Sequence, residues 1–176
     1  NILGPLTNPA CTNAQLLGVY DRKMVMPVAF ALQKLGCEEA MVVHGLDGLD
    51  EVSTIGKTVI AHLKCGEVKK FETTPKAFGV KKACITDLQC LSAQESGETL
   101  FKILNGKNGC CFKTDIVLVN SAAGIMVGGK AESFKEGLEL ARESIESGAA
   151  YSKLKSLVIA SGGDLVHLEE LELKYD

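Results

Sequence analysis

Short apolar runs and one amphipathic segment alternate along the first part of the chain. The run "AQLLGVY" at 14–20 has strand character, and apolar residues in 22–35 recur at the spacing of one helical face. Asp21 is placed to cap this helix and Gly36 to stop it. The segment "EAMVVH" at 39–44 is an apolar run, which is typical of a parallel strand covered on both faces. Strand, helix and strand in this order predict one βαβ unit.

The pattern then changes to two strand-like segments joined by a short turn. Residues 58–63 and 68–73 flank "KCGE", and Gly66 supplies the backbone freedom that a tight turn needs. These features predict an antiparallel hairpin. Residues 74–91 show no regular pattern, and we expect irregular structure there.

Helical patterns dominate the second half of the chain. We expect a helix at 92–104 that ends before Gly106, and a last helix at 149–159. Between them, Ser133 and Glu136 form a capping-box pattern that predicts the start of another helix.

The segment "TDIVLVNSAAGIMVGG" at 114–129 is ambiguous. Its "IVLV" run alone indicates a strand, whereas the small residues that follow favour a buried helix capped by Thr114 or Asp115. We expect the helix. The chain, 1–176, is then a single α/β domain with a mostly parallel sheet, flanking helices and an antiparallel hairpin.

Composition restricts the classes of function. The 176 residues are 46% hydrophobic and 23% charged, which is globular composition. No stretch of about 20 apolar residues predicts a membrane span. The formal net charge is −3, basic residues are scattered and Trp is absent, so no nucleic-acid partner is expected. Seven cysteines without a CxxC motif favour reduced thiols in an intracellular protein.

Three carboxylates follow the second predicted strand. The stretch "VVHGLDGLDEVS" at 42–53 carries Asp47, Asp50 and Glu51, and like charges this close repel unless water or a cation screens them. Ligands of open α/β sheets bind beyond the carboxyl ends of parallel strands. The adjacent Asp50 and Glu51 are therefore candidate ligands for one hard cation. Magnesium fits because it takes one or two carboxylates together with waters and substrate phosphates.

Plainer interpretations of these residues stay open. Acidic residues in loops are commonly solvated turn formers, and Asp50 or Ser53 is also placed to cap a helical turn. His44 at the strand end and Asn120 inside an apolar segment are expected to be hydrogen-bonding groups. No catalytic residue is identified, since Ser53 has no histidine nearby in sequence to activate it.

Several blocks of the sequence resemble the anthranilate phosphoribosyltransferase family. They are "NILGPLTNPA" at 1–10, "QLLGVYD" at 15–21, the loop at 42–53, "VNSAAGIMVGGKA" at 119–131 and "GLELARESIESGAA" at 137–150. The resemblance spans nearly the whole chain in the order and spacing of the family. It implies the fold of the family's carboxyl-terminal α/β domain, a fold class that nucleoside phosphorylases share.

The resemblance implies transfer of phosphoribose from phosphoribosyl pyrophosphate to the amine of anthranilate, a step of tryptophan biosynthesis. Asp50 and Glu51 match the family's acidic pair residue by residue, and their implied role is to hold magnesium against the pyrophosphate. Asp47 is treated as supportive only. Gly4 and Pro5 of the LGPLTNP block are implied substrate contacts on the anthranilate side of the cleft.

Other motifs of the family do not occur in these 176 residues. The Gly-Thr-Gly-Gly-Asp phosphate loop, the Asn-His-Gly-Asn stretch and the amino-terminal helical domain have no counterpart among them. We therefore expect a portion of a longer two-domain enzyme, inactive in isolation because an acidic pair without a phosphate loop cannot position both reactants. The resemblance also implies a homodimer formed through the helical domain, in the cytoplasm or, in a plant, the plastid.

Other functions stay open at this level. One is a nucleoside-phosphorylase-like enzyme, although that class is not expected to carry the LGPLTNP block. Another is a non-catalytic magnesium-binding module of flavodoxin-like type, although no apolar strand after 39–44 ends in the lone Asp that a phosphoryl receiver needs. A third is a chain whose loop at 42–53 is merely solvated and holds no metal.

Overall fold

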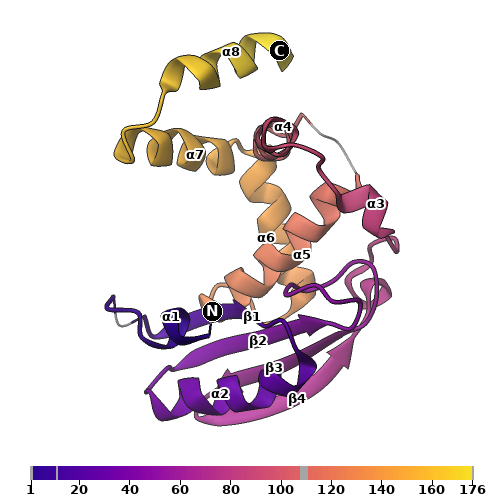
Figure 1. Cartoon of the computed structure of the whole chain (residues 1–176), viewed down its shortest axis with the longest axis vertical. Helices are drawn as coiled ribbons and strands as arrows, with labels where there is room; N and C mark the ends of the chain where they lie inside the picture. The colour runs from indigo at the N-terminus through magenta and orange to yellow at the C-terminus, as the bar shows by residue number, and fades with distance from the viewer. Residues whose placement is uncertain (1, 11, 108–110, 176) are drawn as a thin grey trace.

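The computed structural model describes residues 2–10, 12–107 and 111–175. It contains a four-stranded sheet in the order β1-β2-β3-β4, with helices on both faces (Figure 1). The strands are β1 (Ala14–Gly18), β2 (Glu39–Gly45), β3 (Thr58–Lys64) and β4 (Glu67–Thr73). β1 and β2 are parallel, whereas β2 with β3 and β3 with β4 are antiparallel.

The predicted βαβ unit is confirmed. The chain passes from β1 through a 3-10 turn, η1 (Arg22–Met24), into α2 (Val25–Lys34) and then into β2. The Asp21 carboxylate accepts a hydrogen bond from the Lys23 N–H (2.8 Å), as its predicted capping position requires.

Side chains of β2 alternate between two buried layers. Ala40 and Val42 pack with the buried face of α2, whereas Met41 and Val43 belong to the core cluster under α5 (Phe112–Val127). All four residues are at most 1% exposed. The apolar run in β2 therefore reflects burial on both faces, as the sequence predicted.

The sheet is less parallel than expected. Among the described strands only β1 and β2 form a parallel pair, because residues 46–57 between β2 and β3 contain no helix that could return the chain across the sheet. β3 therefore starts at the edge where β2 ends and runs antiparallel to it. The predicted hairpin follows, with Cys65 (φ 51°) and Gly66 (φ 75°) in its two-residue turn. The α/β class, the flanking helices and the hairpin are confirmed.

The predicted helices at 92–104, 114–129 and 149–159 are confirmed, with shifts of one or two residues at their ends. The sequence pattern did not reveal α8 (Leu165–Tyr175), although Asp164 accepts a hydrogen bond from the Val166 N–H (2.8 Å) and so supplies a start signal for it. No described helix has the length and apolar character needed to cross a bilayer. The helices not yet given are α1 (Leu3–Leu6), η2 (Pro75–Phe78), α3 (Ile85–Leu88), α4 (Ala93–Leu104), α6 (Phe134–Glu146) and α7 (Ala149–Ala160).

The start of α5 differs from expectation. The helix begins at Phe112, and its N-cap is Cys111, whose Sγ accepts a hydrogen bond from the Thr114 N–H (3.4 Å). The expected cap at Thr114 or Asp115 is wrong, because both residues lie inside the first turn. A thiol occupies the position that a hydroxyl or carboxylate usually takes.

The start of α6 follows its capping-box pattern in part. The Ser133 hydroxyl accepts a hydrogen bond from the Glu136 N–H (3.2 Å), as predicted. The Glu136 carboxylate accepts from the Glu132 N–H (2.9 Å), one residue before the N-cap. α6 then packs along α5, and both helices lie on the sheet face opposite α2 (Figure 1).

The carboxyl-terminal helices α7 and α8 lie away from the sheet and contact α4 (Figure 1). Glu98 of α4 accepts hydrogen bonds from the Tyr175 hydroxyl and from Lys174 Nζ (3.0 Å) of α8. These two bonds, the tyrosine bond first, lower the pKa of Glu98 to about 2. The Tyr151 hydroxyl of α7 donates to Glu172 of α8 (2.7 Å). Hydrogen bonds to two carboxylates therefore hold α8 in place.

Docking of α8 is expected to weaken in acid. A carboxyl group whose pKa is lowered by folding stabilises the native state above its ordinary pKa of 4.5, and this contribution is lost as the pH falls toward about 2. Glu98→Gln removes the same charge at neutral pH. Amide hydrogen exchange at pH 7 should therefore be faster in α8 of this variant than in the wild type. Glu169→Gln, at an exposed position of α8, is the control, and equal exchange in both variants would contradict the prediction.

Candidate functional site

The acidic loop, residues 46–57, lies across the carboxyl ends of the two parallel strands. It follows β2, and its residue Asp50 packs directly on Gly18, the last residue of β1. A Cβ atom at Gly18 would lie 1.6 Å from the Asp50 carbonyl oxygen, so only glycine leaves room for this backbone contact. Sequence reasoning did not single out Gly18. The structure places Asp50 at the edge where ligands of α/β sheets bind.

Asp47 and Ser53 hold the acidic loop together from within. The Asp47 carboxylate accepts hydrogen bonds from the Ser53 hydroxyl (2.6 Å) and from the Leu49 N–H (3.3 Å). The Ser53 hydroxyl oxygen in turn accepts from the N–H groups of Ile55 (2.9 Å) and Gly56 (3.2 Å). Because its carboxylate is used within the loop, Asp47 has a structural role there.

Asn120 of α5 binds the backbone of the acidic loop. The Val52 N–H donates to Asn120 Oδ1 (2.8 Å), and Asn120 Nδ2 donates to the Val52 carbonyl (3.0 Å). Nδ2 also donates to the Ile116 carbonyl (2.9 Å), one turn earlier in α5. The predicted hydrogen-bonding role of Asn120 is confirmed. Its partner left no signal in the sequence, because the two residues are 68 positions apart.

Asp50 and Glu51, which we call the acidic pair, lie in the loop between Asp47 and Val52. Both residues are exposed. Neither carboxylate forms a hydrogen bond or ion pair within the part of the chain that the structure describes. The pKa of Glu51 is raised, first because neighbouring protein displaces water from its carboxyl group and second because Asp50 is negatively charged. A cation beside the acidic pair would offset this repulsion.

The acidic pair supplies only some of the ligands that a metal ion needs. Among the described residues, no group of three or more His, Cys, Asp or Glu side chains could hold a metal ion. Two adjacent carboxylates supply hard oxygen ligands only, so water or a charged ligand would have to complete the coordination. This set suits magnesium, which keeps several waters and binds substrate phosphates. It does not suit zinc, which takes three or four protein ligands, usually nitrogen and sulfur.

His44 joins the end of β2 to the end of β1. Its Nδ1 lies 2.7 Å from the Val19 carbonyl oxygen, and the residue is 7% exposed. The expected hydrogen-bonding role at the strand end is confirmed. This contact holds together the two strand ends on which the acidic loop rests.

Gly4 and Pro5 lie in α1, at the other end of β1 from the acidic pair. The Pro5 carbonyl accepts a hydrogen bond from Gln15 Nε2 (3.3 Å), near the start of β1, whereas Gly18 at its end contacts Asp50. Three residues of strand span about 10 Å. Pro5 borders a hollow of about 410 Å³ at this end of β1. The structure therefore does not bring Gly4 and Pro5 together with the acidic pair.

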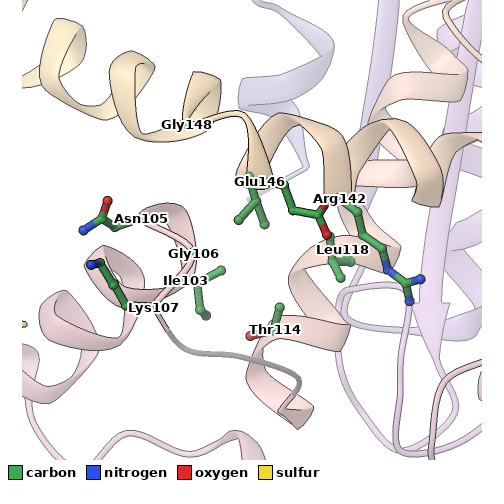
Figure 2. Close-up of a pocket in the computed structure, with 10 residues that line it drawn as sticks. Ile103, Asn105, Gly106, Lys107, Thr114, Leu118, Arg142, Glu146 and Gly148 are labelled. Carbon is green, nitrogen blue, oxygen red and sulfur yellow. The ribbon is translucent and has the colours of Figure 1, made fainter. Parts of the chain in front are cut away.

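A larger hollow of about 590 Å³ is bordered by α4, α5 and α6 (Figure 2). Sequence reasoning assigned no function to the residues around it. Figure 2 shows Lys107 and Arg142 on opposite walls, with Leu118 and Thr114 between them. Because its cationic side chains do not converge, this hollow is not a second candidate site.

Comparisons of sequence with known proteins agree with one another. Residues 1–151 match the glycosyl transferase family, a/b domain. The anthranilate phosphoribosyltransferase of Clostridium kluyveri is 48% identical over 158 residues, which cover 90% of this chain and 47% of that protein. The chain therefore spans about half the length of the curated relatives it matches.

Solved structures extend this similarity to the fold. The anthranilate phosphoribosyltransferase from Thermus thermophilus matches with a TM-score of 0.80 and 35% identity, covering 90% of this chain and 46% of that one. The anthranilate phosphoribosyltransferase from Saccharomyces cerevisiae in complex with PRPP and Mg matches with a TM-score of 0.75 and 30% identity, covering 87% and 44%.

Gly18→Ala is expected to destabilise the protein, because its Cβ would meet the Asp50 carbonyl oxygen at 1.6 Å and force the acidic loop away from β1. We expect a loss of about 1–3 kcal/mol in the free energy of unfolding, measured by urea denaturation. Gly124→Ala in α5 is the matched control, since a Cβ there meets nothing within 4 Å. It should stabilise the helix by about 0.5–1 kcal/mol. Equal stability changes in the two variants would show that Gly18 is not a contact point.

Proposed function

The chain belongs to the glycosyl transferase family, and from this premise we propose that it takes part in transferring phosphoribose from phosphoribosyl pyrophosphate to anthranilate in tryptophan biosynthesis. The observation that carries the proposal is the placement of two adjacent carboxylates, without a partner among the described residues, at the joined ends of parallel strands. Similarity to anthranilate phosphoribosyltransferases over 90% of the chain supports the choice of substrates.

The role of the acidic pair follows from the charge of the reactant. Phosphoribosyl pyrophosphate loses a highly charged pyrophosphate when its glycosidic bond breaks. When bound, magnesium would supply the positive charge that offsets this developing negative charge. Asp50 and Glu51 would hold the ion at the strand ends, while the Asp47 carboxylate binds Leu49 and Ser53 within the acidic loop. The Saccharomyces cerevisiae relative, described in complex with PRPP and Mg, supports this role.

Gly4 and Pro5 are proposed contacts on the anthranilate side of the cleft. This part of the proposal depends on the LGPLTNP block of the sequence. The geometry adds only that Pro5 borders a hollow at the far end of β1 from the acidic pair.

The relatives' length bears on how the protein is organised. Because the chain spans 47% of the Clostridium kluyveri protein, we propose that residues 1–176 supply one α/β domain of a two-domain enzyme. A homodimer formed through a helical domain, and a location in the cytoplasm or in a plant plastid, belong to this same proposal.

Replacing the acidic pair is expected to weaken magnesium-dependent pyrophosphate binding. Asp50→Asn with Glu51→Gln keeps the size of both side chains and removes the two charges that would hold the ion. Isothermal titration with magnesium pyrophosphate should show affinity lower by more than about tenfold. The matched control is Glu169→Gln with Glu170→Gln, a second adjacent acidic pair that is exposed on α8. Unchanged binding in the Asp50 and Glu51 variant would overturn the proposed metal role.

The 176-residue chain is expected not to turn over substrate by itself. No Gly-Thr-Gly-Gly-Asp phosphate loop occurs in its sequence, so the acidic pair alone cannot position both reactants. Incubation with phosphoribosyl pyrophosphate, anthranilate and magnesium should leave anthranilate fluorescence unchanged. Turnover near the ordinary enzyme rate of about 10 s⁻¹ would contradict this expectation.

A further inference from the structure

We propose that Asn120 is a positioning residue for the acidic pair: by binding both backbone polar groups of Val52, it fixes the direction in which Asp50 and Glu51 present their carboxylates to a divalent cation. This inference rests on the proposed function of the acidic pair. It adds a residue of α5 whose bonds go to the backbone of the acidic loop and not to the carboxylates of the acidic pair.

The side-chain amide of Asn120 binds Val52 as the peptide groups of a neighbouring strand would, with one acceptor and one donor. One arm of the Asn120 carboxamide accepts from the Val52 N–H at 2.8 Å, and the other donates to the Val52 carbonyl at 3.0 Å. A neighbouring strand would offer the same donor and acceptor to a residue it pairs with. Two opposed bonds to one residue restrict both the position and the rotation of that residue. Val52 is therefore held in the manner of a strand residue, although it lies in a loop.

Because Val52 is adjacent to the acidic pair, fixing its position also limits the movement of Asp50 and Glu51. Val52 follows Glu51 directly, and its side chain is fully buried in the core cluster under α5. On the other side, the Asp50 carbonyl rests on Gly18. Both flanks of the acidic pair are fixed, while its carboxylates have no partner in the described chain. A cation then finds its ligands already oriented, and less conformational freedom is lost when it binds.

Asn120 is an unexpected residue for its local environment. Asparagine is a poor helix former, because its side chain competes for backbone hydrogen bonds. Here it lies within the 16-residue helix α5, next to the buried Val119. A residue that breaks a local rule commonly does so at a functional site. Its bonds to Val52 account for an amide at this position, where an aliphatic residue would otherwise suit the helix.

The test compares Asn120→Ala with Leu138→Ala in this same chain. Leu138 is a buried residue of α6 in the same core cluster, so its truncation lowers stability without removing a bond to the acidic loop. Both variants are titrated with magnesium pyrophosphate at a temperature where circular dichroism shows them folded. Asn120→Ala should weaken binding by about tenfold, the size of effect seen for groups that orient metal ligands. Leu138→Ala should bind as the wild type does.

A double-mutant comparison separates positioning from general damage. Once Asp50→Asn and Glu51→Gln have removed the ligands, adding Asn120→Ala should cause no further loss of binding. Asn120→Asp provides a second variant, since it can still accept from the Val52 N–H but cannot donate to the Val52 carbonyl. It should also weaken binding.

The outcomes distinguish this inference from the proposed function. If the wild type binds magnesium pyrophosphate, the Asp50 and Glu51 variant binds it more weakly, and Asn120→Ala binds normally, Asn120 has no positioning role while the proposed function stands. If the wild type and the Asp50 and Glu51 variant bind equally well, or neither binds, the proposed function fails and this inference fails with it. If both Asn120 variants remain unfolded with and without metal, Asn120 serves folding alone and the inference is overturned.

Discussion

The backbone of the acidic loop is fixed on both sides of the acidic pair, and the candidate site depends on this constraint. Two adjacent carboxylates repel each other, and a loop without anchors would let them separate into solvent. Gly18 lets the loop lie directly on the end of β1, and Asn120 binds the loop backbone at Val52. The charges therefore stay at one edge of the sheet, although no described residue neutralises them.

This constraint requires a sheet that is covered on both faces. α2 packs on one face through the layer that contains Val42, and α5 packs on the other through the layer that contains Met41 and Val43. Because α5 crosses above β1 and β2, it can carry an amide to the loop that leaves β2. The hydrophobic layers thus supply stability and also place Asn120 where its two hydrogen bonds hold Val52.

Local patterns predicted most elements, and the exceptions have causes that lie outside the local sequence. The βαβ unit and the hairpin follow from runs of apolar residues and from the turn at Gly66. The sheet is less parallel than the sequence predicted, because a helix-free connection reverses the chain at the end of β2. α8 was missed although Asp164 supplies a local start signal for it. The bonds that hold this helix join it to Glu98 of α4 and to Tyr151 of α7, which lie far from it in the chain.

The sequence by itself determined the α/β class, the position of the strands and the identity of the acidic pair, because period, turn chemistry and adjacent charges are properties of neighbouring residues. Only the tertiary structure decided that Gly18 and Asn120 support this pair and that Gly4 and Pro5 lie at the opposite end of β1. A contact such as that between Val52 and Asn120, 68 residues apart, is created when the layers pack. It therefore leaves no periodic trace in the chain.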